Sequence, residues 1–170
     1  MTIHVCPLSR LQDVVAAHRP SHLVTLLDPG HEIPTPAEME ASLHLKLGVH
    51  DITALVEGYT PPDETLVTRL VDFGRTWDRS RPLVAHCWAG VSRSSASAFV
   101  LACEKNPHVD EAVIARALRR ASSVAWPNRL IVSLADDLLG RGGRMVDAVN
   151  LIGPGRADCE NVPFSLRSAW

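Results

Sequence analysis

A cysteine and an arginine lie six residues apart in the stretch HCWAGVSRS, residues 86–94. The preceding run PLVAH predicts a buried strand, and small residues with one glycine separate the cysteine from the arginine. A loop that wraps around a helix N-terminus points several backbone N–H groups at one spot, where they and the helix dipole favour an anion. We therefore expect a phosphate cradle with a nucleophilic sulfur at its floor, formed by Trp88, Ala89, Gly90, Val91, Ser92 and Arg93.

Each polar side chain of this stretch fits a role in phosphate chemistry. Arg93 offers a planar fork that grips two phosphate oxygens, and Gly90 lets the backbone take a conformation closed to other residues. A thiol at a helix N-terminus beside an arginine ionises readily, so we expect Cys87 to be a thiolate at neutral pH. We expect Ser94 to donate a hydrogen bond to that sulfur, and His86 to orient the loop rather than to act as a base.

The elements that must position these residues alternate along the chain. Strands are expected at 2–6, 22–28, 43–49 and 82–86. Helices are expected over 10–18 with Ser9 as cap, over 36–42 with Thr35 as cap, and over 63–78, 92–105, 110–122, 127–139 and 144–151. This alternation predicts an α/β fold in which helices flank a central, largely parallel sheet of four to five strands. Ligands bind such sheets outside the carboxyl ends of the strands, which is where the cysteine lies.

The length of 170 residues suits one catalytic domain over 1–170. The part after about residue 141 is Gly-rich and weakly patterned, and we expect a C-terminal extension packed on the body. The start of the chain lacks the basic and apolar regions of a signal peptide, and no apolar run is long enough to span a membrane. We therefore expect a cytoplasmic protein, whose thiols stay reduced.

Composition argues against several classes of partner. There are 17 Lys and Arg against 19 Asp and Glu, a formal net charge of −2, which disfavours bulk binding to nucleic acid or to anionic membranes. The four cysteines form no CxxC pair, and the eight histidines form no HxxxH or HxH pair, so no metal site is expected. We expect no cofactor.

The stretch HCWAGVSRS resembles the signature of the cysteine-dependent protein tyrosine phosphatases, and it is closest to the pattern HCxAGxSRS of the small dual-specificity branch. The resemblance is strong over 82–105 and looser from 22 to 129. It implies a phosphatase-like fold and a metal-independent hydrolysis of phosphomonoesters through a phosphocysteine intermediate. The implied substrate is a phosphorylated protein or peptide, with tyrosine-only and dual specificity both open.

The resemblance also implies an aspartate that acts as general acid from a movable upstream loop. Asp51 precedes Cys87 by 36 residues (87 − 51), a separation similar to that in the family, and it follows a predicted strand. Asp63, 24 residues before the cysteine (87 − 63), is the alternative, although the two prolines ahead of it indicate a helix cap. The loop between the two aspartates is longer than usual in the small enzymes, which leaves the choice open.

A Pro-Asn pair at 127–128 resembles a pair that follows the signature helix in the same branch. The resemblance implies that Asn128 lies near the phosphate loop, where it supports the loop or positions water. A simple helix start explains the pair equally well.

Other functions fit parts of the pattern. A phosphoinositide phosphatase usually carries Lys at the variable loop positions, which here are the uncharged Trp88, Ala89, Val91 and Ser92. A non-catalytic phosphate-binding module typically loses the Cys, the Arg or the Asp, and this chain retains all three. A persulfide transferase commonly has one residue fewer in its loop. The protein phosphatase is therefore favoured, and hydrolysis of phosphoinositides or other non-protein phosphates is the alternative.

Overall fold

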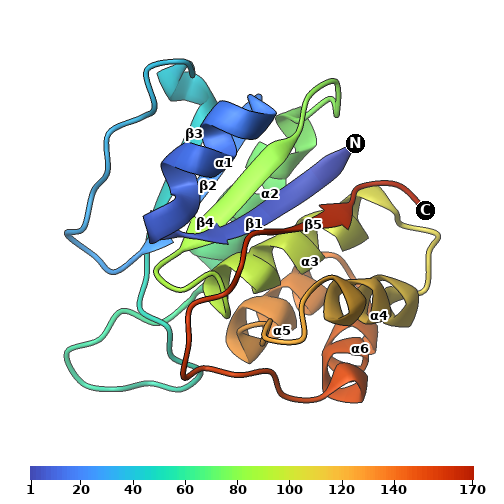
Figure 1. Cartoon of the computed structure of the whole chain (residues 1–170). Coiled ribbons are helices and arrows are strands. Elements are labelled where there is room, and N and C mark those ends of the chain that lie inside the picture. Colours follow the sequence, from blue (N-terminus) through green and yellow to red (C-terminus); the bar gives the residue numbers. More distant parts are fainter.

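A five-stranded sheet runs through the centre of the computed structural model, which describes residues 1–170 (Figure 1). The strands follow the order β3-β2-β4-β1-β5 across the sheet. Their bounds are Thr2–Pro7 (β1), His22–Leu27 (β2), His44–Gly48 (β3), Leu83–Cys87 (β4) and Phe164–Arg167 (β5). The pairs β3-β2, β2-β4 and β4-β1 are parallel, and β5 is antiparallel to β1. The expected α/β fold with a largely parallel sheet is confirmed.

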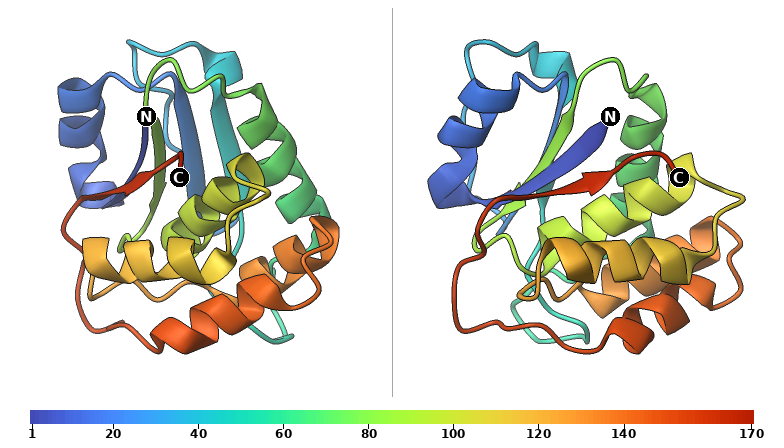
Figure 2. Two further views of the ribbon diagram at one scale, coloured as in Figure 1. Left: turned by 90° about the vertical axis from the view of Figure 1, so that its right-hand side faces the viewer. Right: turned by 45° about the vertical axis from the view of Figure 1, so that its right-hand side comes forward.

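Helices cover both faces of the sheet unequally. Helix α1 alone lies on one face, and the other five helices lie on the opposite face (Figure 2). The helices span Leu11–His18 (α1), Glu64–Thr76 (α2), Arg93–Lys105 (α3), Glu111–Ala121 (α4), Arg129–Leu138 (α5) and Arg144–Ile152 (α6). Because both faces are covered, the inner strands β2 and β4 are buried along their whole length, which explains their nearly continuous apolar sequences.

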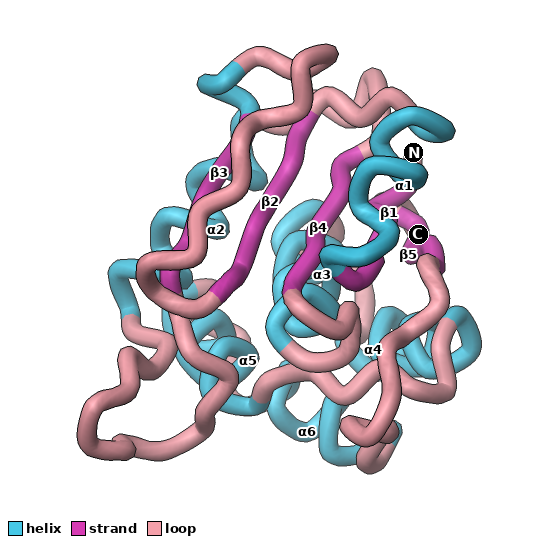
Figure 3. The backbone as a smooth tube through the Cα atoms, turned by 60° about the vertical axis from the view of Figure 1, so that its left-hand side comes forward, coloured by secondary structure: helices cyan, strands magenta, loops and turns pink.

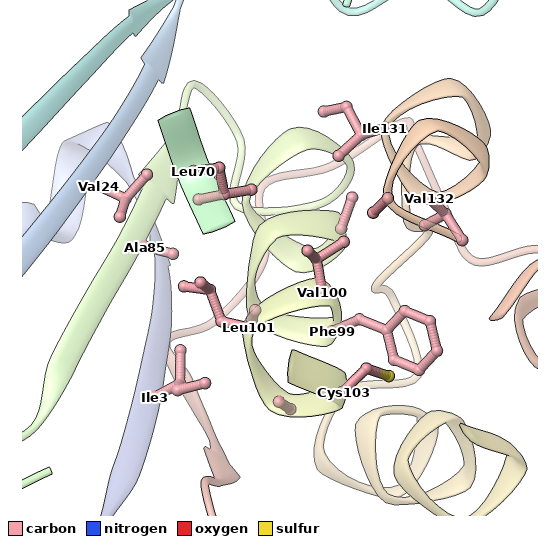
Figure 4. Packing of buried hydrophobic residues seen from close by; sticks show 14 of the residues in the cluster. Ile3, Val24, Leu70, Ala85, Phe99, Val100, Leu101, Cys103, Ile131 and Val132 are labelled. Atoms are coloured by element: carbon pink, nitrogen blue, oxygen red, sulfur yellow. The ribbon is translucent and has the colours of Figure 1, made fainter. Parts of the chain in front are cut away.

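Helix α3 lies at the centre of the larger helical layer. All its residues from Arg93 to Cys103 are buried, and Phe99, Val100 and Leu101 pack toward the strands and α5 (Figure 4). Helix α2 approaches α3 closely at Gly74, where a Cβ would overlap the end of the Leu101 side chain and force it to move. The helix that begins at the phosphate loop is thus fixed on every side by the core.

The side chains of Asp63, Asp110 and Asn128 accept hydrogen bonds from backbone N–H groups in the first turns of α2, α4 and α5. The predicted cap Ser9 is wrong. A short 3-10 helix, Leu8–Arg10, precedes α1, and the Ser9 hydroxyl donates to Glu160 rather than capping a helix.

The helix predicted over 36–42 does not form. The structure has only a 3-10 turn at Ala41–Leu43, and Thr35 lies beside the ring of His44 instead of capping a helix. None of the residues 31–43 is buried. A helix this short gains too little from propensity alone and needs a packed face; in this segment only the half-buried Ile33 and Met39 contact a hydrophobic cluster.

The extension after residue 141 is an integral part of the fold. Helix α6 confirms the expected helix near 144–151, and Arg141 forms a buried ion pair with Glu111 of α4 at 3.0 Å. The chain then crosses below the helices and adds β5 to the edge of the sheet (Figure 1). The sequence pattern does not locate this fifth strand. It has four residues and lies at the edge of the sheet, so it is too short to show a clear alternation of apolar and polar residues.

No helix is both long and apolar enough to cross a lipid bilayer.

Candidate active site

The parallel strands end at one edge of the sheet, and the predicted site residues gather there. Strand β4 ends at Cys87, five residues form a tight loop, and α3 begins at Arg93 (Figure 3). Asp28 directly follows β2, and Val49 directly follows β3 at the same edge. The location agrees with the expectation that ligands bind outside the carboxyl ends of the strands.

The carbonyl groups of loop residues 88–92 all point outward and accept hydrogen bonds. Their donors are Leu8 N for Trp88 (3.1 Å), Asn161 N for Ala89 (2.8 Å), Asn161 Nδ2 for Gly90 (3.0 Å), Trp126 N for Val91 (2.9 Å), and Ala96 N for Ser92 (2.9 Å). A trans peptide holds its N–H opposite its C=O, so the N–H groups of residues 89–93, which share peptides with these carbonyls, point inward. None of the N–H groups of residues 88–92 donates to a protein acceptor. The loop is therefore a cup of unused donors, which is an anion site.

Gly90 is required for this loop by its conformation and by its neighbours. Its φ of +69° lies in the left-handed region that favours glycine. A Cβ at this position would lie 2.7 Å from the backbone N of Pro7 and 2.8 Å from the carbonyl carbon of Cys6. The loop thus rests directly on the backbone at the end of β1.

The thiol of Cys87 lies at the floor of the cup. The residue is 2% exposed, and its Sγ lies 3.1 Å from Ser94 Oγ. Ser94 is fully buried and has no other hydrogen-bond partner, so its single hydroxyl proton is available to the sulfur. This is the contact that the sequence predicts.

The guanidinium of Arg93 is buried, and only one of its nitrogens donates hydrogen bonds within the protein. Its Nη1 donates to Asp28 Oδ1 at 2.7 Å and to the carbonyl of Val49 at 2.6 Å. Its Nε is buried without any partner, and Nη2 makes no hydrogen bond. The Nε and Nη2 donors on that edge match the spacing of two phosphate oxygens. The ion pair with Asp28 therefore holds the guanidinium with these two donors free.

Asp28 is a site residue that the sequence analysis missed. Partial burial opposes its ionisation, but the hydrogen bond and charge of Arg93 outweigh that effect and hold the pKa of the carboxyl below its usual value. Its position at the end of a parallel strand is a signal that could have identified it.

Asp51 lies at the rim of the cup, and Asp63 does not. Asp51 Oδ1 accepts hydrogen bonds from Ser92 Oγ at 2.7 Å and from Asn128 Nδ2 at 2.8 Å, while Oδ2 has no partner. The carboxylate of Asp63 accepts from Leu66 N at 2.7 Å as the cap of α2. One oxygen of Asp51 is thus anchored, and the other is free to carry a proton.

Asn128 is the helix start that the sequence allows, and its side chain also contacts Asp51. Its Oδ1 accepts from the N–H groups of Leu130 and Ile131 at the start of α5, and its Nδ2 holds Asp51. The residue therefore begins a helix and also orients a carboxylate beside the loop.

His86 and Trp88 lie on either side of Cys87 in sequence. His86 is fully buried, its Nε2 lies 2.7 Å from Thr25 Oγ1, and burial lowers its pKa to about 4. A neutral imidazole that is buried away from solvent suits an orienting role. The indole of Trp88 makes an edge contact with His31 at 4.9 Å, so it packs on the loop after β2 rather than on a helix.

Asn161 is a second contributor that the sequence analysis missed. Its backbone and side chain hold two loop carbonyls, and its Oδ1 accepts from Ser122 Oγ at 3.0 Å. Nothing in the sequence indicates this role, because Asn161 lies in a weakly patterned segment 71 residues from Gly90.

The remaining cysteines take no part in the cup. Cys103 is in the core, and burial raises its pKa far above the ordinary range. Cys6 pairs with His86 on β4, and its side chain packs under α1, on the face of the sheet opposite Cys87. Burial raises the pKa of Cys6 to about 12. No group of three or more His, Cys, Asp or Glu side chains is placed to hold a metal ion.

A groove of about 430 Å³ adjoins the cup on the side of Asp51. Ser92, Asp51, Trp126 and Arg129 are among the residues that line it. The groove offers room for the group that carries a bound phosphate.

No protein-family model matches the chain, and no curated protein sequence is similar to it. Solved structures do match. DUSP15 has a TM-score of 0.60 and 14% identity over 88% of this chain and 89% of its own. PTPMT1 in complex with PI(5)P has a TM-score of 0.59 and 14% identity over 83% and 94% of the two chains. Human DUSP28 has a TM-score of 0.59 and 15% identity over 82% and 92%. The chain therefore has the fold of the small, dual-specificity type of cysteine-dependent phosphatase.

Proposed function

We propose that the protein is a metal-independent phosphomonoester hydrolase that works through a phosphocysteine on Cys87. The observation that carries the proposal is the set of unused donors around the sulfur. The inward N–H groups of the loop and the free Nε edge of Arg93 surround a buried thiol and lack any acceptor of their own. Buried donors without partners are costly, so the site is built for a ligand with several oxygens.

The first step transfers the phosphoryl group to sulfur. The Cys87 thiolate attacks phosphorus, an S–P bond forms, and the bond from phosphorus to the ester oxygen breaks. The equatorial oxygens receive hydrogen bonds from the loop amides and Arg93, where charge is spread in the transition state. Asp51 gives its proton to the departing oxygen, so the alcohol leaves neutral.

The second step releases phosphate. A water molecule attacks phosphorus and gives a proton to the Asp51 carboxylate, the S–P bond breaks, and the thiolate is restored. The Ser94 hydroxyl stabilises the sulfur as it departs, because it lies 3.1 Å away and has no competing partner. Asn128 and Ser92 keep Asp51 at the rim throughout.

We propose a phosphorylated protein or peptide as substrate. Arg93 is the only cation in the cup, and the variable loop positions are uncharged. This charge suits one phosphate monoester better than the several phosphates of an inositol polyphosphate. The groove with Trp126 beside Asp51 gives an aromatic leaving group a surface to pack against.

A direct test compares turnover of p-nitrophenyl phosphate by the wild type, Cys87→Ser and Cys159→Ser. Turnover should vanish in the first variant and persist in the second, which changes a cysteine outside the cup. A phosphoprotein labelled on Cys87 should be detected by mass spectrometry after acid quench. Unchanged turnover in Cys87→Ser would remove the sulfur from the mechanism.

The substrate class needs its own assay. Phosphotyrosine, phosphoserine and phosphothreonine peptides should be compared with phosphoinositide vesicles at equal phosphate concentration. We expect the highest kcat/KM for phosphotyrosine peptides. Faster release of phosphate from the lipids would overturn the proposed protein substrate while leaving the hydrolase in place.

A further inference from the structure

Asp51, the proposed general acid, lies near the start of a loop that has no core of its own. Strand β3 ends at Gly48, α2 begins at Glu64, and the chain between them extends away from the body of the molecule (Figure 1). Every residue from 53 to 60 is exposed. Packing therefore does not fix this loop, and hydrogen bonds must hold the end that carries Asp51.

His50 and Thr60 close the loop with two hydrogen bonds. The N–H of His50 donates to the carbonyl of Thr60 at 2.9 Å, and the N–H of Thr60 donates to Nδ1 of the His50 ring at 2.9 Å. Pro61 biases the backbone of Thr60 toward the extended form, in which the N–H and C=O of one residue point to the same side. We call this pair of hydrogen bonds the His50–Thr60 clasp.

The ring of His50 takes the place of a backbone carbonyl in the clasp. Two facing residues of an antiparallel pair normally exchange both of their N–H···O=C bonds. Here the carbonyl of His50 is already occupied, because it accepts from the N–H of Ile52 at 3.0 Å. This bond from residue 52 to residue 50 makes a γ-turn with Asp51 at its centre. The φ of Asp51 is negative, so the turn is of the inverse type that is common at strand ends.

The γ-turn and the clasp together hold the carboxylate at the rim of the cup. The side chain of Asn128 donates both to Asp51 Oδ1 at 2.8 Å and to the carbonyl of Ile52 at 3.3 Å. We propose that His50 is a positioning residue for the general acid: its ring closes the loop in place of its carbonyl, which is thereby free to form the turn around Asp51. This inference deepens the proposed hydrolase function and rests on it.

The clasp specifies what can replace His50. A backbone N–H can only donate, so Nδ1 carries a lone pair and the proton of the neutral ring is on Nε2. Asparagine has a carbonyl oxygen as many bonds from Cα as Nδ1 is, whereas phenylalanine has a ring of similar size and no acceptor. Because the His50 ring also makes an edge contact with Tyr59 at 4.8 Å, these two replacements separate the hydrogen bond from the packing.

The leaving group reports whether the acid is in place. Phenyl phosphate expels a basic phenolate and needs a proton from Asp51, whereas 2,4-dinitrophenyl phosphate expels a weakly basic anion that leaves without one. His50→Phe should lower kcat/KM for phenyl phosphate about tenfold and change kcat/KM for 2,4-dinitrophenyl phosphate less than about twofold. His50→Asn should recover most of the loss, because its side chain accepts from Thr60.

Two results of this assay would overturn the proposal. Equal losses on both substrates in His50→Phe would show damage to the cup rather than a misplaced acid, and wild-type values on both would show that the ring acceptor is not needed. Tyr59→Leu is the matched control, since it removes the ring contact and keeps the acceptor. The ratio of the two kcat/KM values should stay at the wild-type level in Tyr59→Leu; a shift there that His50→Phe lacks would assign the role to packing.

Hydrogen exchange of the Thr60 amide tests the clasp without relying on activity. This amide should be protected in the wild type and in His50→Asn, and it should exchange at least about tenfold faster in His50→Phe. A wild-type amide that exchanges as fast as a free one would overturn the clasp, even where His50→Phe does not fold. The hydrolase and the clasp fail separately: turnover by Cys87→Ser removes the former, and a Cys87-dependent enzyme with an unprotected Thr60 amide loses only the latter.

Discussion

Replacing Gly90 with alanine tests whether the phosphate loop depends on the close approach of its backbone to β1. Two separate costs are expected. The left-handed φ of +69° costs an L-residue about 1–2 kcal/mol. A Cβ placed 2.7 Å from Pro7 N and 2.8 Å from Cys6 C adds an overlap with backbone atoms, which cannot rotate away and costs about a further 1–3 kcal/mol.

Gly140→Ala is a matched control that separates these costs. Gly140 has a similar φ of +63°, but a Cβ there would meet nothing within 4 Å. Gly140→Ala should therefore show the conformational cost alone, a drop in Tm of roughly 2–8 °C. Gly90→Ala should fall about 2–12 °C further, because it also carries the overlap.

The two variants are compared by thermal unfolding and by binding of orthovanadate measured by calorimetry. Gly90→Ala should lose affinity for vanadate, because relief of the overlap displaces the inward amide groups, and Gly140→Ala should bind as the wild type does. Equal changes of Tm in both variants, with vanadate binding intact in Gly90→Ala, would refute the packing of the loop on β1.

Further substitutions probe the other parts of the site. Asp51→Asn should lower kcat about 100-fold and flatten the limb of the pH–rate profile that reports the acid, whereas Asp63→Asn should lower Tm by a few degrees and leave the profile intact; the reverse would move the acid to Asp63. Asn161→Ala should reduce kcat and vanadate affinity about tenfold, because the Gly90 carbonyl loses its side-chain donor while the backbone N–H of residue 161 still binds the Ala89 carbonyl; wild-type affinity would show that this side-chain hydrogen bond does not hold the loop in place. The free energy of unfolding should fall as pH drops from 6.5 to about 4, because His86 binds a proton in the unfolded chain but stays neutral while it is buried in the fold. His86 should account for about 3 kcal/mol of this loss. His86→Asn should therefore show a weaker dependence of the unfolding free energy on pH in chemical unfolding.

The sequence located the cup because its determinants are local. A strand end, a glycine and an arginine at fixed spacing specify a loop at a helix N-terminus without reference to the rest of the chain. Asp51 was also within reach, since it follows a predicted strand at the same edge of the sheet. The helix predicted over 36–42 failed for the opposite reason: its cap and prolines are local signals, but none of its residues is buried, and only Met39 among them packs against a hydrophobic cluster.

The residues that support the cup could not be predicted, because each acts across a long separation in sequence. Asn161 reaches Gly90 over 71 residues, and Thr25 reaches His86 over 61. Neither residue belongs to a pattern, and an asparagine or threonine gains its role only from the partner that the fold brings to it. Asp28 is intermediate: its place after β2 indicates the right edge of the sheet, but its pairing with Arg93 requires the strand order.

An anion cup is unstable as a free loop, because inward amides without acceptors are a cost that the chain must offset elsewhere. Here the offset comes from the outward side, where residues directly after β1, after α4 and in the C-terminal extension engage different carbonyls. With every carbonyl held, the loop cannot turn its amides outward to satisfy them before a ligand arrives. The distant segments therefore do more than stabilise the fold: they keep the donors unsatisfied and already aimed, so that a bound phosphate meets a site that needs no rearrangement.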